Sequence, residues 1–475
     1  MKMTEKKGSG ADILYQLDGR PSLKHAIPIG LQHVFAMFAG NIAPLLIITS
    51  LAGLAVPVSN QDVVIMLQCA MLMSGIATLV QVLPIRIGKF RIGSGLPLVI
   101  GSSFAFVPIM TTVAQEYGIL AIFGGSLVGG LMGILMGLFI KPLRKLFPPI
   151  VVGSVLVTIG LNLLPTGARY FAGGSATLPD GSVNPDFGSW QNLVLGFTVL
   201  LIITLINRFG KGMLKNLGIL IGIAAGYLLA FLMGGGRVDF TPVVEAAWFE
   251  LPRFLHFKPE FHLDAILRFA VVYIIVGLET MGNMTGITNA TMERDAKPEE
   301  ISGGLIGNAL TSQIGALFGT FPTSAFGQNA GLVSVSKVVN RFSIGVGAVI
   351  MLIAAFCPKI GAFFQAMPSS VLGGAVISVF AVIFLNGVKL LAREGFSPNN
   401  IQVLSLTFGV GYGLGTVLSS VKTMPVAVHF ILGEPVLLVC IVAILSNLLF
   451  NGRAKEKEQP KEEKAGDAKP SAKEA

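Results

Sequence analysis

The sequence predicts an all-α polytopic membrane protein with fourteen transmembrane segments in a 7+7 inverted repeat. The first observation is composition, since 53% of the 475 residues are hydrophobic and only 12% are charged. Soluble domains average about 25% charged residues, so this chain cannot cover a globule with polar surface. The second is that apolar stretches recur from about residue 26 to residue 450. The third is a set of motifs that occur once in each half of the chain.

The individual segments follow from length, because a bilayer core of about 30 Å requires about 20 apolar residues per helix. The third and tenth segments are unusually short. Lys and Arg in the short loops fall on the same side as the basic N-terminus, which indicates that both termini are cytoplasmic. We place the segments at residues 26–50, 62–84, 97–112, 118–140, 149–164, 192–206, 217–233, 265–288, 302–319, 322–336, 343–366, 370–391, 400–420 and 432–450.

Charge and cysteine usage exclude several classes of protein. The net charge of +9 comes from loops and tails and includes no basic, aromatic-rich module, so we expect no nucleic-acid partner. Cys69, Cys357 and Cys440 lie far apart, without the spacing of disulfide frameworks or zinc sites. We therefore expect no metal and no cofactor. Residues 1–25 form a cytoplasmic N-terminal segment, and residues 451–475 form a low-complexity tail that we expect to be disordered.

Three pairs of related motifs support the repeat. They link segments one, three and five with segments eight, ten and twelve, in that order. Because seven is odd, the second half must enter the membrane from the opposite face, which is the inverted-repeat plan of secondary transporters. The pairs are Gly40-Asn41 with Gly282-Asn283, LPLVIGSSF at 96–104 with FPTSAFGQN at 321–329, and PPIVVGSV from Pro148 with PSSVLGGAV from Pro368.

The two short segments are predicted to carry the functional site. Residues 96–101 and 321–326 contain Pro and precede Gly/Ser clusters. Non-helical backbone cannot face lipid, so these pieces must be buried in protein. If they pair, each opens into a half-helix whose N-terminal amides attract carbonyl oxygens or anions. The expected donors are the amides that follow Ser102, Ser103, Gly327 and Gln328. The alternative is a pair of kinked helices that close packing gaps.

Glu279 is the acidic candidate, because no Lys or Arg lies within ten residues on either side. An acid at membrane depth costs about 2.5 to 3.5 kcal/mol and usually lines an ion or substrate path. It can exchange a proton, or stay ionised and accept N–H bonds from a ligand. Alternatively, neighbouring hydroxyls satisfy it for packing alone. His33 in the first segment is either part of a proton network or structural. Uncharged polar residues either join that network or only hold helices together; they are Asn41, Asn283, Asn308 and Ser312.

The run from Gln328 to Lys337 resembles the signature of the nucleobase-ascorbate transporter family, also called nucleobase:cation symporter 2. That signature has Gln, Glu or Pro, then Asn, any residue and Gly, and later Thr and a basic residue. Ser336 stands where Thr is usual. Gln32-His33, the run from Gly101 to Phe106, Glu279 and FPTSAFGQN also match the family in order.

The resemblance implies a core domain and a gate domain, and a homodimer. The core comprises residues 26–140 and 265–366, and the gate comprises residues 141–264 and 367–450. The core would move against the gate in an elevator-type mechanism driven by proton symport. Glu279 and Gln328 would bond the base edge, while Phe104 packs on its ring and amides near Phe104 and Gly327 reach its carbonyls. The expected substrate site also includes Ser103 and Asn329, and the proton network includes Glu279, His33, Asn308 and Asn283.

The residue at the first position of the signature, Gln328 in this sequence, indicates which substrate is carried. Members with Gln there look like xanthine or uric acid carriers, and those with Glu look like uracil carriers. Asn308 stands where many bacterial purine members carry Asp, which puts the coupling ion and stoichiometry in question. The alternatives are a uracil or broader nucleobase symporter, a passive facilitator, and an anion transporter on the same fold. An enzyme is not expected, because His33, His256 and His429 have no evident Ser or Asp partner at matching depth. The expected location is the cytoplasmic membrane.

Overall fold

The computed structural model describes residues 12–452, except 52–53, 89, 141–145, 178–181, 212–213, 215–216, 235, 422–427 and 429–431. The described chain is almost entirely helical, with two short antiparallel two-stranded sheets. It contains eight helices that are long and apolar enough to cross a membrane, or nine if one bent pair counts as a span. The prediction of a polytopic helical membrane protein is thereby confirmed. The predicted tail comprises residues 451–475, of which Asn451 ends the last described helix, and the part from residue 453 lies outside the described residues.

The helices and strands follow the predicted segments closely. The first half contains η1 (Asp12–Tyr15), α1 (Leu23–Thr49), α2 (Asn60–Val82), β1 (Ile85–Ile87), β2 (Phe90–Ile92), β3 (Ile100–Ser102), η2 (Phe104–Phe106), α3 (Val107–Glu116), α4 (Ile119–Gly129), α5 (Leu131–Leu138), α7 (Pro149–Phe171), α8 (Trp190–Phe209), α10 (Gly218–Met233) and α11 (Thr241–Glu245). The second half contains α12 (Leu263–Met292), α13 (Pro298–Leu317), β4 (Thr323–Ala325), α14 (Gly327–Ser336), α15 (Arg341–Ala355), α16 (Pro358–Gln365), α17 (Ser369–Glu394), α18 (Pro398–Leu406), η3 (Thr407–Leu414), α19 (Gly415–Leu418) and α21 (Pro435–Asn451). Each predicted range overlaps one or more of these elements, and several helices extend beyond the predicted ends, as α7 does to Phe171. The count of fourteen spans and the inverted repeat stay predictions.

Several predicted segments are not single straight helices. In the eleventh, α15 and α16 meet at an angle of 83°, and Pro358 opens α16. Proline has no amide hydrogen and cannot continue the ladder of the preceding helix, which accounts for the break. The thirteenth contains the π-helical stretch η3, whose sequence TFGVGYGL alternates glycine with larger residues. Such stretches mark helices that depart locally from regular α geometry.

Close helix packing depends on glycine at two contacts. A Cβ atom on Gly30 of α1 would lie 2.7 Å from the backbone nitrogen of Gly347 of α15. A Cβ atom on Gly387 of α17 would lie 2.7 Å from the carbonyl oxygen of Gly153 of α7. Helices in a bilayer gain little from burying apolar surface, so small residues that let backbones approach each other stabilise the bundle.

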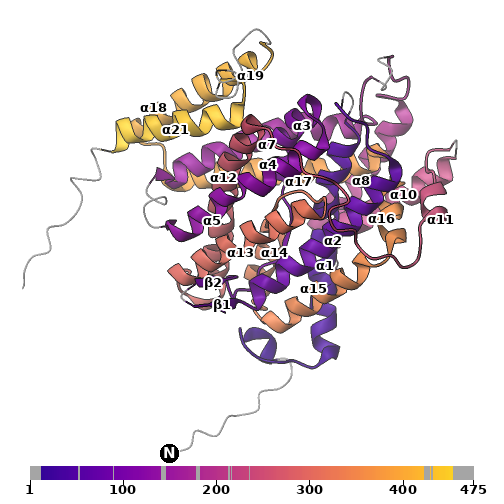
Figure 1. Cartoon of the computed structure of the whole chain (residues 1–475), viewed down its shortest axis with the longest axis horizontal. Helices are drawn as coiled ribbons and strands as arrows, with labels where there is room; N and C mark the ends of the chain where they lie inside the picture. Colours follow the sequence, from indigo (N-terminus) through magenta and orange to yellow (C-terminus); the bar gives the residue numbers. More distant parts are fainter. Residues whose placement is uncertain are drawn as a thin grey trace, which may run out of the picture.

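Figure 1 shows how the helices are distributed. Helices α18 and α21 lie side by side at one edge of the molecule, and α10 and α11 lie at the opposite edge. Helices α2, α7, α12 and α17 occupy the region between them. The β1–β2 hairpin lies beside α13.

Candidate functional site

The two Pro-led segments meet in the interior as strands β3 and β4. They pair antiparallel, with Ile100 opposite Ala325 and Ser102 opposite Thr323, and every residue of both strands is buried. The pairing extends by one bond at each end, from the Phe326 amide to the Val99 carbonyl at 2.9 Å and from the Ser103 amide to the Pro322 carbonyl at 2.9 Å. The predicted extended segments are thus present and paired.

Buried side chains bond the outer edge of β3. The Ile100 amide donates to the Thr78 hydroxyl at 3.0 Å, and the Ser102 amide donates to Asn41 Oδ1 at 2.8 Å. Asn41 Oδ1 also accepts from the Ser74 hydroxyl at 2.7 Å. Unpaired amides at membrane depth cost several kcal/mol each, so these side chains replace the neighbouring strand that β3 lacks. Asn41 therefore supports the strand directly.

The outer edge of β4 is bonded in the same way by helices α12 and α13. The Thr323 amide donates to the Ser312 hydroxyl at 3.0 Å, and Asn308 Nδ2 donates to the Thr323 carbonyl at 2.9 Å. Asn283 Nδ2 donates to the Ala325 carbonyl at 3.1 Å. Asn283 and Asn308, which the sequence analysis assigned to a proton network, thus bond the strand that leads into the site.

Substituting Asn41 by Ala is expected to lower stability by about 1 to 3 kcal/mol, because the Ser102 amide and the Ser74 hydroxyl lose a buried acceptor. The measurement is the melting temperature of the purified protein in detergent. Asn289→Ala is the matched control, since Asn289 is an exposed residue of α12. Equal melting temperatures for the two variants would contradict the role given to Asn41.

A cavity of about 160 Å³ opens where the two strands end and their helices begin. The cavity is lined by the end of β3 with η2, by β4 with the start of α14, by α12, and by α7 and α17. Five predicted site residues line it: Ser103, Phe104, Glu279, Gly327 and Gln328. The remaining lining residues are Ser102, Ala105, Leu156, Ile159, Ser324, Ala325, Phe326, Val379, Val382, Ile383 and Asn386.

Hydrogen-bonding groups at the cavity differ in one respect from the sequence expectation. The amide that follows Ser102 is that of Ser103, and it already donates to the Pro322 carbonyl, so it is not an available donor. The first amides of α14, after Phe326, have no acceptor within their own helix because of their position. The Ser103 hydroxyl is buried and has no hydrogen-bond partner. This hydroxyl and the α14 amides are the groups positioned to bond a ligand.

Glu279 lines the cavity from the middle of α12 and is partly exposed there. None of the ion pairs formed by the described residues includes it. The ring of Phe104 contacts the ring of Phe380 in α17 edge to face, with centroids 5.2 Å apart. The cavity therefore presents one acid and one aromatic ring beside the two helix starts.

Asn329 and His33 pack against each other outside the lining of the cavity. Asn329 Nδ2 lies 3.1 Å from His33 Nδ1 and donates to the His33 carbonyl at 3.0 Å. Both residues are buried. The structure thus places Asn329, an expected substrate contact, behind the site, where it ties α14 to α1.

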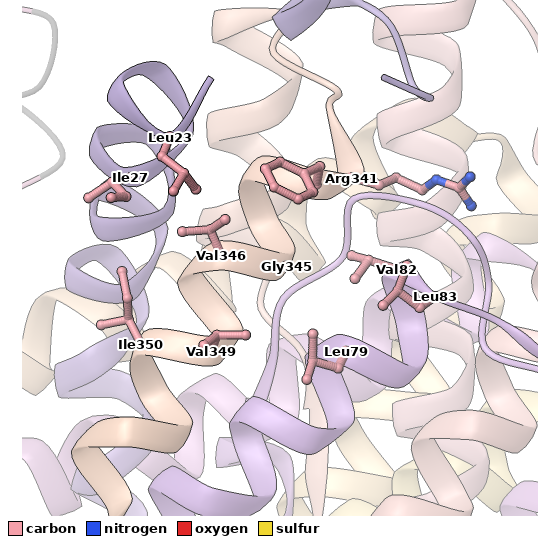
Figure 2. A pocket seen from close by; sticks show the side chains of 11 residues that line it. Leu23, Ile27, Leu79, Val82, Leu83, Arg341, Gly345, Val346, Val349 and Ile350 are labelled. Atoms are coloured by element: carbon pink, nitrogen blue, oxygen red, sulfur yellow. The ribbon is translucent and has the colours of Figure 1, made fainter. Parts of the chain in front are cut away.

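A second hollow is almost entirely apolar. This groove of about 430 Å³ lies between α1, α2 and α15, and Figure 2 shows Leu23, Ile27, Leu79, Val349 and other aliphatic side chains around it. Its one charged lining residue, Arg341, bonds the Gly95 carbonyl and pairs with Asp18. The groove has no polar group free to orient a heterocycle, so we assign the site to the cavity at β3 and β4.

The part of the cavity lining that comes from α7 and α17 was not predicted from the sequence. Its α17 residues are Val379, Val382, Ile383 and Asn386, which are spaced as one face of a helix. An asparagine within an otherwise apolar segment was the available signal. Which face of α17 turns toward the site depends on how α7 and α17 pack, which is not encoded in local spacing.

Comparison with known proteins adds sequence relatives and structural neighbours. A family model described as "Permease family" (Xan_ur_permease) matches residues 24–420. The uric acid permease PucJ of Bacillus subtilis is 35% identical, covering 90% of this chain and 93% of that protein. The xanthine permease of Bacillus subtilis is 34% identical, with 91% and 96% covered. The xanthine permease XanP of Escherichia coli is 29% identical, with 93% and 95% covered.

Two solved structures share the fold. The transmembrane domain of the cyanobacterial bicarbonate transporter BicA has a TM-score of 0.51 at 15% identity, covering 90% of this chain and 98% of that one. Murine Slc26a9, an anion transporter in the inward-facing state, has a TM-score of 0.59 at 10% identity, covering 96% and 74%. At these identities the likeness concerns the fold alone.

Proposed function

The chain belongs to this permease family and is a membrane-spanning transporter rather than an enzyme, and from this premise we propose that it takes up a purine nucleobase, xanthine or uric acid. The observation that carries the proposal is the cavity between β3, β4 and α12, lined by Glu279, Gln328 and Phe104. The relatives named above as xanthine and uric acid permeases support the choice of substrate class.

The lining groups match the chemistry of an oxopurine. Such a base carries adjacent N–H and C=O groups along its edge. Glu279 accepts N–H bonds, and the Gln328 amide offers both a donor and an acceptor. Phe104 packs on the ring, and the Ser103 hydroxyl and the amide near Gly327 bond its carbonyls. The cavity is smaller than the roughly 300 to 1,000 Å³ that drug-sized ligands occupy, which suits a single base.

The proposed transport cycle couples the base to a proton through Glu279, with His33, Asn283 and Asn308 as neighbouring polar groups. Fourteen segments form a core (26–140 and 265–366) and a gate (141–264 and 367–450), and the core moves against the gate as an elevator. The protein is proposed to be a homodimer in the cytoplasmic membrane with both termini in the cytoplasm. The position of the cavity between α12 of the core and α7 and α17 of the gate supports this cycle.

The decisive experiment is uptake by cells that express the protein, measured against xanthine, uric acid, hypoxanthine, guanine and uracil. We expect uphill accumulation of a purine that collapses with a protonophore. Equilibration without accumulation would indicate a passive facilitator. Transport of sulfate or bicarbonate without purine uptake would indicate an anion transporter, a reading that the negative charge of Glu279 in the cavity disfavours.

Gln328→Glu is expected to weaken purine uptake about tenfold and to increase uracil uptake. The variant loses the amide donor and adds a second carboxylate to a cavity that already holds Glu279, so an oxopurine carbonyl loses its partner. The measurement is competition of each base against labelled xanthine. Gln61→Glu, at an exposed position early in α2, is the control for the added charge. Unchanged competition by xanthine and uric acid would refute this role.

A further inference from the structure

Among the described residues, helices α7 and α17 contribute a single polar side chain to the lining of the cavity that Glu279 also lines. Helices α7 and α17 contribute Leu156, Ile159, Val379, Val382, Ile383 and Asn386, and all but the last are aliphatic. The spacing of Val379, Val382, Ile383 and Asn386 corresponds to one face of α17. Asn386 is exposed on this face, and the described structure gives its side chain no hydrogen bond.

We propose that Asn386 is a specificity-determining residue, whose amide bonds the edge of the base that faces α17. This inference rests on the proposed function. An amide carries both donors and an acceptor, so it pairs with either a C=O or an N–H group of a purine. Within an aliphatic wall it favours a base that presents a polar group there, because a base without one leaves the amide unpaired. Glu279 of α12 and Gln328 of α14 also bond the base.

The test compares Asn386→Leu, Asn386→Gln and wild type in uptake competition with xanthine, uric acid, hypoxanthine and guanine. Loss of one neutral hydrogen bond corresponds to a change of about two- to tenfold in apparent affinity. We expect Asn386→Leu to weaken some bases by that factor and not others, which changes their ranking. Asn386→Gln should retain more of the wild-type ranking. Leu385→Ala is the control, since Leu385 is the adjacent exposed residue and does not line the cavity.

The outcomes separate the two proposals. If wild type takes up purines and Asn386→Leu leaves the ranking unchanged, or weakens all bases equally, the role of Asn386 is refuted while the proposed function stands. If wild type takes up no purine, both fail.

A different observation supports a second inference. The N-terminal part of α12, on its predicted extracellular side, contains a buried cluster of charged residues. Arg268 is only 3% exposed. Its Nη1 lies 3.1 Å from Glu116 Oε2 and 3.4 Å from Glu434 Oε1, and its Nη2 lies 3.5 Å from Asp264 Oδ2. Three acids thus surround one buried guanidinium, and Glu434 is itself 5% exposed.

The partners come from different predicted domains. Glu116 ends α3 and Asp264 lies in the first turn of α12, both in the predicted core, while Glu434 precedes α21 of the predicted gate. We infer that Arg268 and Glu434 form a latch that holds this end of the transporter closed in the conformation observed. The inference rests on the core–gate movement proposed above. Arg268 and Glu279 are eleven residues apart, about three helical turns, so both lie on the same face of α12.

The other two acids determine where the latch breaks. When α21 moves away, Arg268 keeps Glu116 and Asp264 as partners, whereas Glu434 loses the only ion-pair partner that it has among the described residues. A buried carboxylate without a partner is strongly unfavourable, so the pair separates only as water reaches Glu434. Opening of this end and hydration of Glu434 are therefore one event, and Arg268 is a positioning residue for it.

The test is labelling of a reporter cysteine by a membrane-impermeant maleimide added outside the cell. Val113→Cys is the reporter, because Val113 is fully buried one turn before Glu116, and the three native cysteines are replaced. We expect little labelling with the intact latch and a severalfold increase with Glu434→Gln. Glu434→Asp, which keeps the charge, should label less than Glu434→Gln, and Glu260→Gln, at an exposed acid near the start of α12, should match the parent.

Two results would overturn the latch. One is equal labelling in the parent and in Glu434→Gln, when both elute as a single folded species by size exclusion. The other is an equal increase in Glu434→Gln and Glu260→Gln, which would attribute the effect to surface charge rather than to the pair with Arg268.

Discussion

Replacing Glu279 by Gln is expected to reduce purine accumulation by about 10- to 150-fold while leaving the amount of inserted protein unchanged. Among the described residues, Glu279 is the one acidic side chain that lines the cavity. A hydrogen bond to a charged group contributes about 1.5 to 3 kcal/mol, and its loss corresponds to this range of affinity. Gln retains the shape of the side chain, so the variant removes the charge and little else.

The measurement is the initial rate of xanthine and uric acid uptake at matched abundance in the membrane. Glu293→Gln is the control, because Glu293 is an exposed acid that follows α12 directly. Near-normal uptake by Glu279→Gln would remove this residue from the mechanism.

A second readout separates binding from coupling in the same variant. Exchange of labelled for unlabelled base across the membrane requires binding and movement but no net proton transfer. If Glu279 carries the proton, exchange should persist better than accumulation in Glu279→Gln. Equal loss of both would restrict Glu279 to substrate binding.

Gly101→Ala is expected to produce the largest structural effect among single-atom additions at the site. A Cβ atom on Gly101 in β3 would lie 2.2 Å from Phe326 Cε2 and 2.8 Å from Asn41 Oδ1. Phe326 lines the cavity and Asn41 holds the edge of β3, so both would have to shift. Overpacking of this kind costs about 1 to 3 kcal/mol. We expect a lower melting temperature and a loss of uptake of about tenfold or more.

Gly331→Ala is the matched control, since it lies in α14 near the same site and a Cβ atom there meets nothing within 4 Å. The double variant Gly101→Ala, Phe326→Leu provides relief by shortening the side chain that clashes, and it should recover part of the melting temperature. Wild-type behaviour of Gly101→Ala would show that β3 and Phe326 adapt freely, which would contradict a rigid packing of the paired strands β3 and β4 against Phe326 and Asn41.

The outline of the site followed from local sequence features. Pro97 and Pro322 interrupt two apolar segments, and the Gly/Ser residues after them permit a helix to start, so the two extended pieces were recognisable. Glu279 was recognisable because an acid without a nearby base is rare in an apolar run. These features involve residues close in sequence, and the bilayer limits the backbone to very few alternatives.

The roles of the buried asparagines could not be predicted from the sequence as well as the positions of the strands and Glu279. Asn283 and Asn308 were predicted either to join a proton network or to hold helices together; their amides bond carbonyls of β4, and a part in proton transfer stays a prediction. Asn329 was expected to contact substrate, but it bonds His33. An asparagine can serve any of these purposes with the same residue pattern. Only the position of its partner distinguishes them.

The amino-acid order alone therefore determined that the chain resides in a membrane, where its helices lie, and where the two extended segments of the site interrupt them, because solvation by lipid acts on each segment separately. Tertiary packing decided that Asn386 lines the same cavity as Glu279 and that Glu434 reaches Arg268. Those contacts join helices distant in the chain, and their geometry depends on the close approach of whole helices rather than on the preference of any one residue.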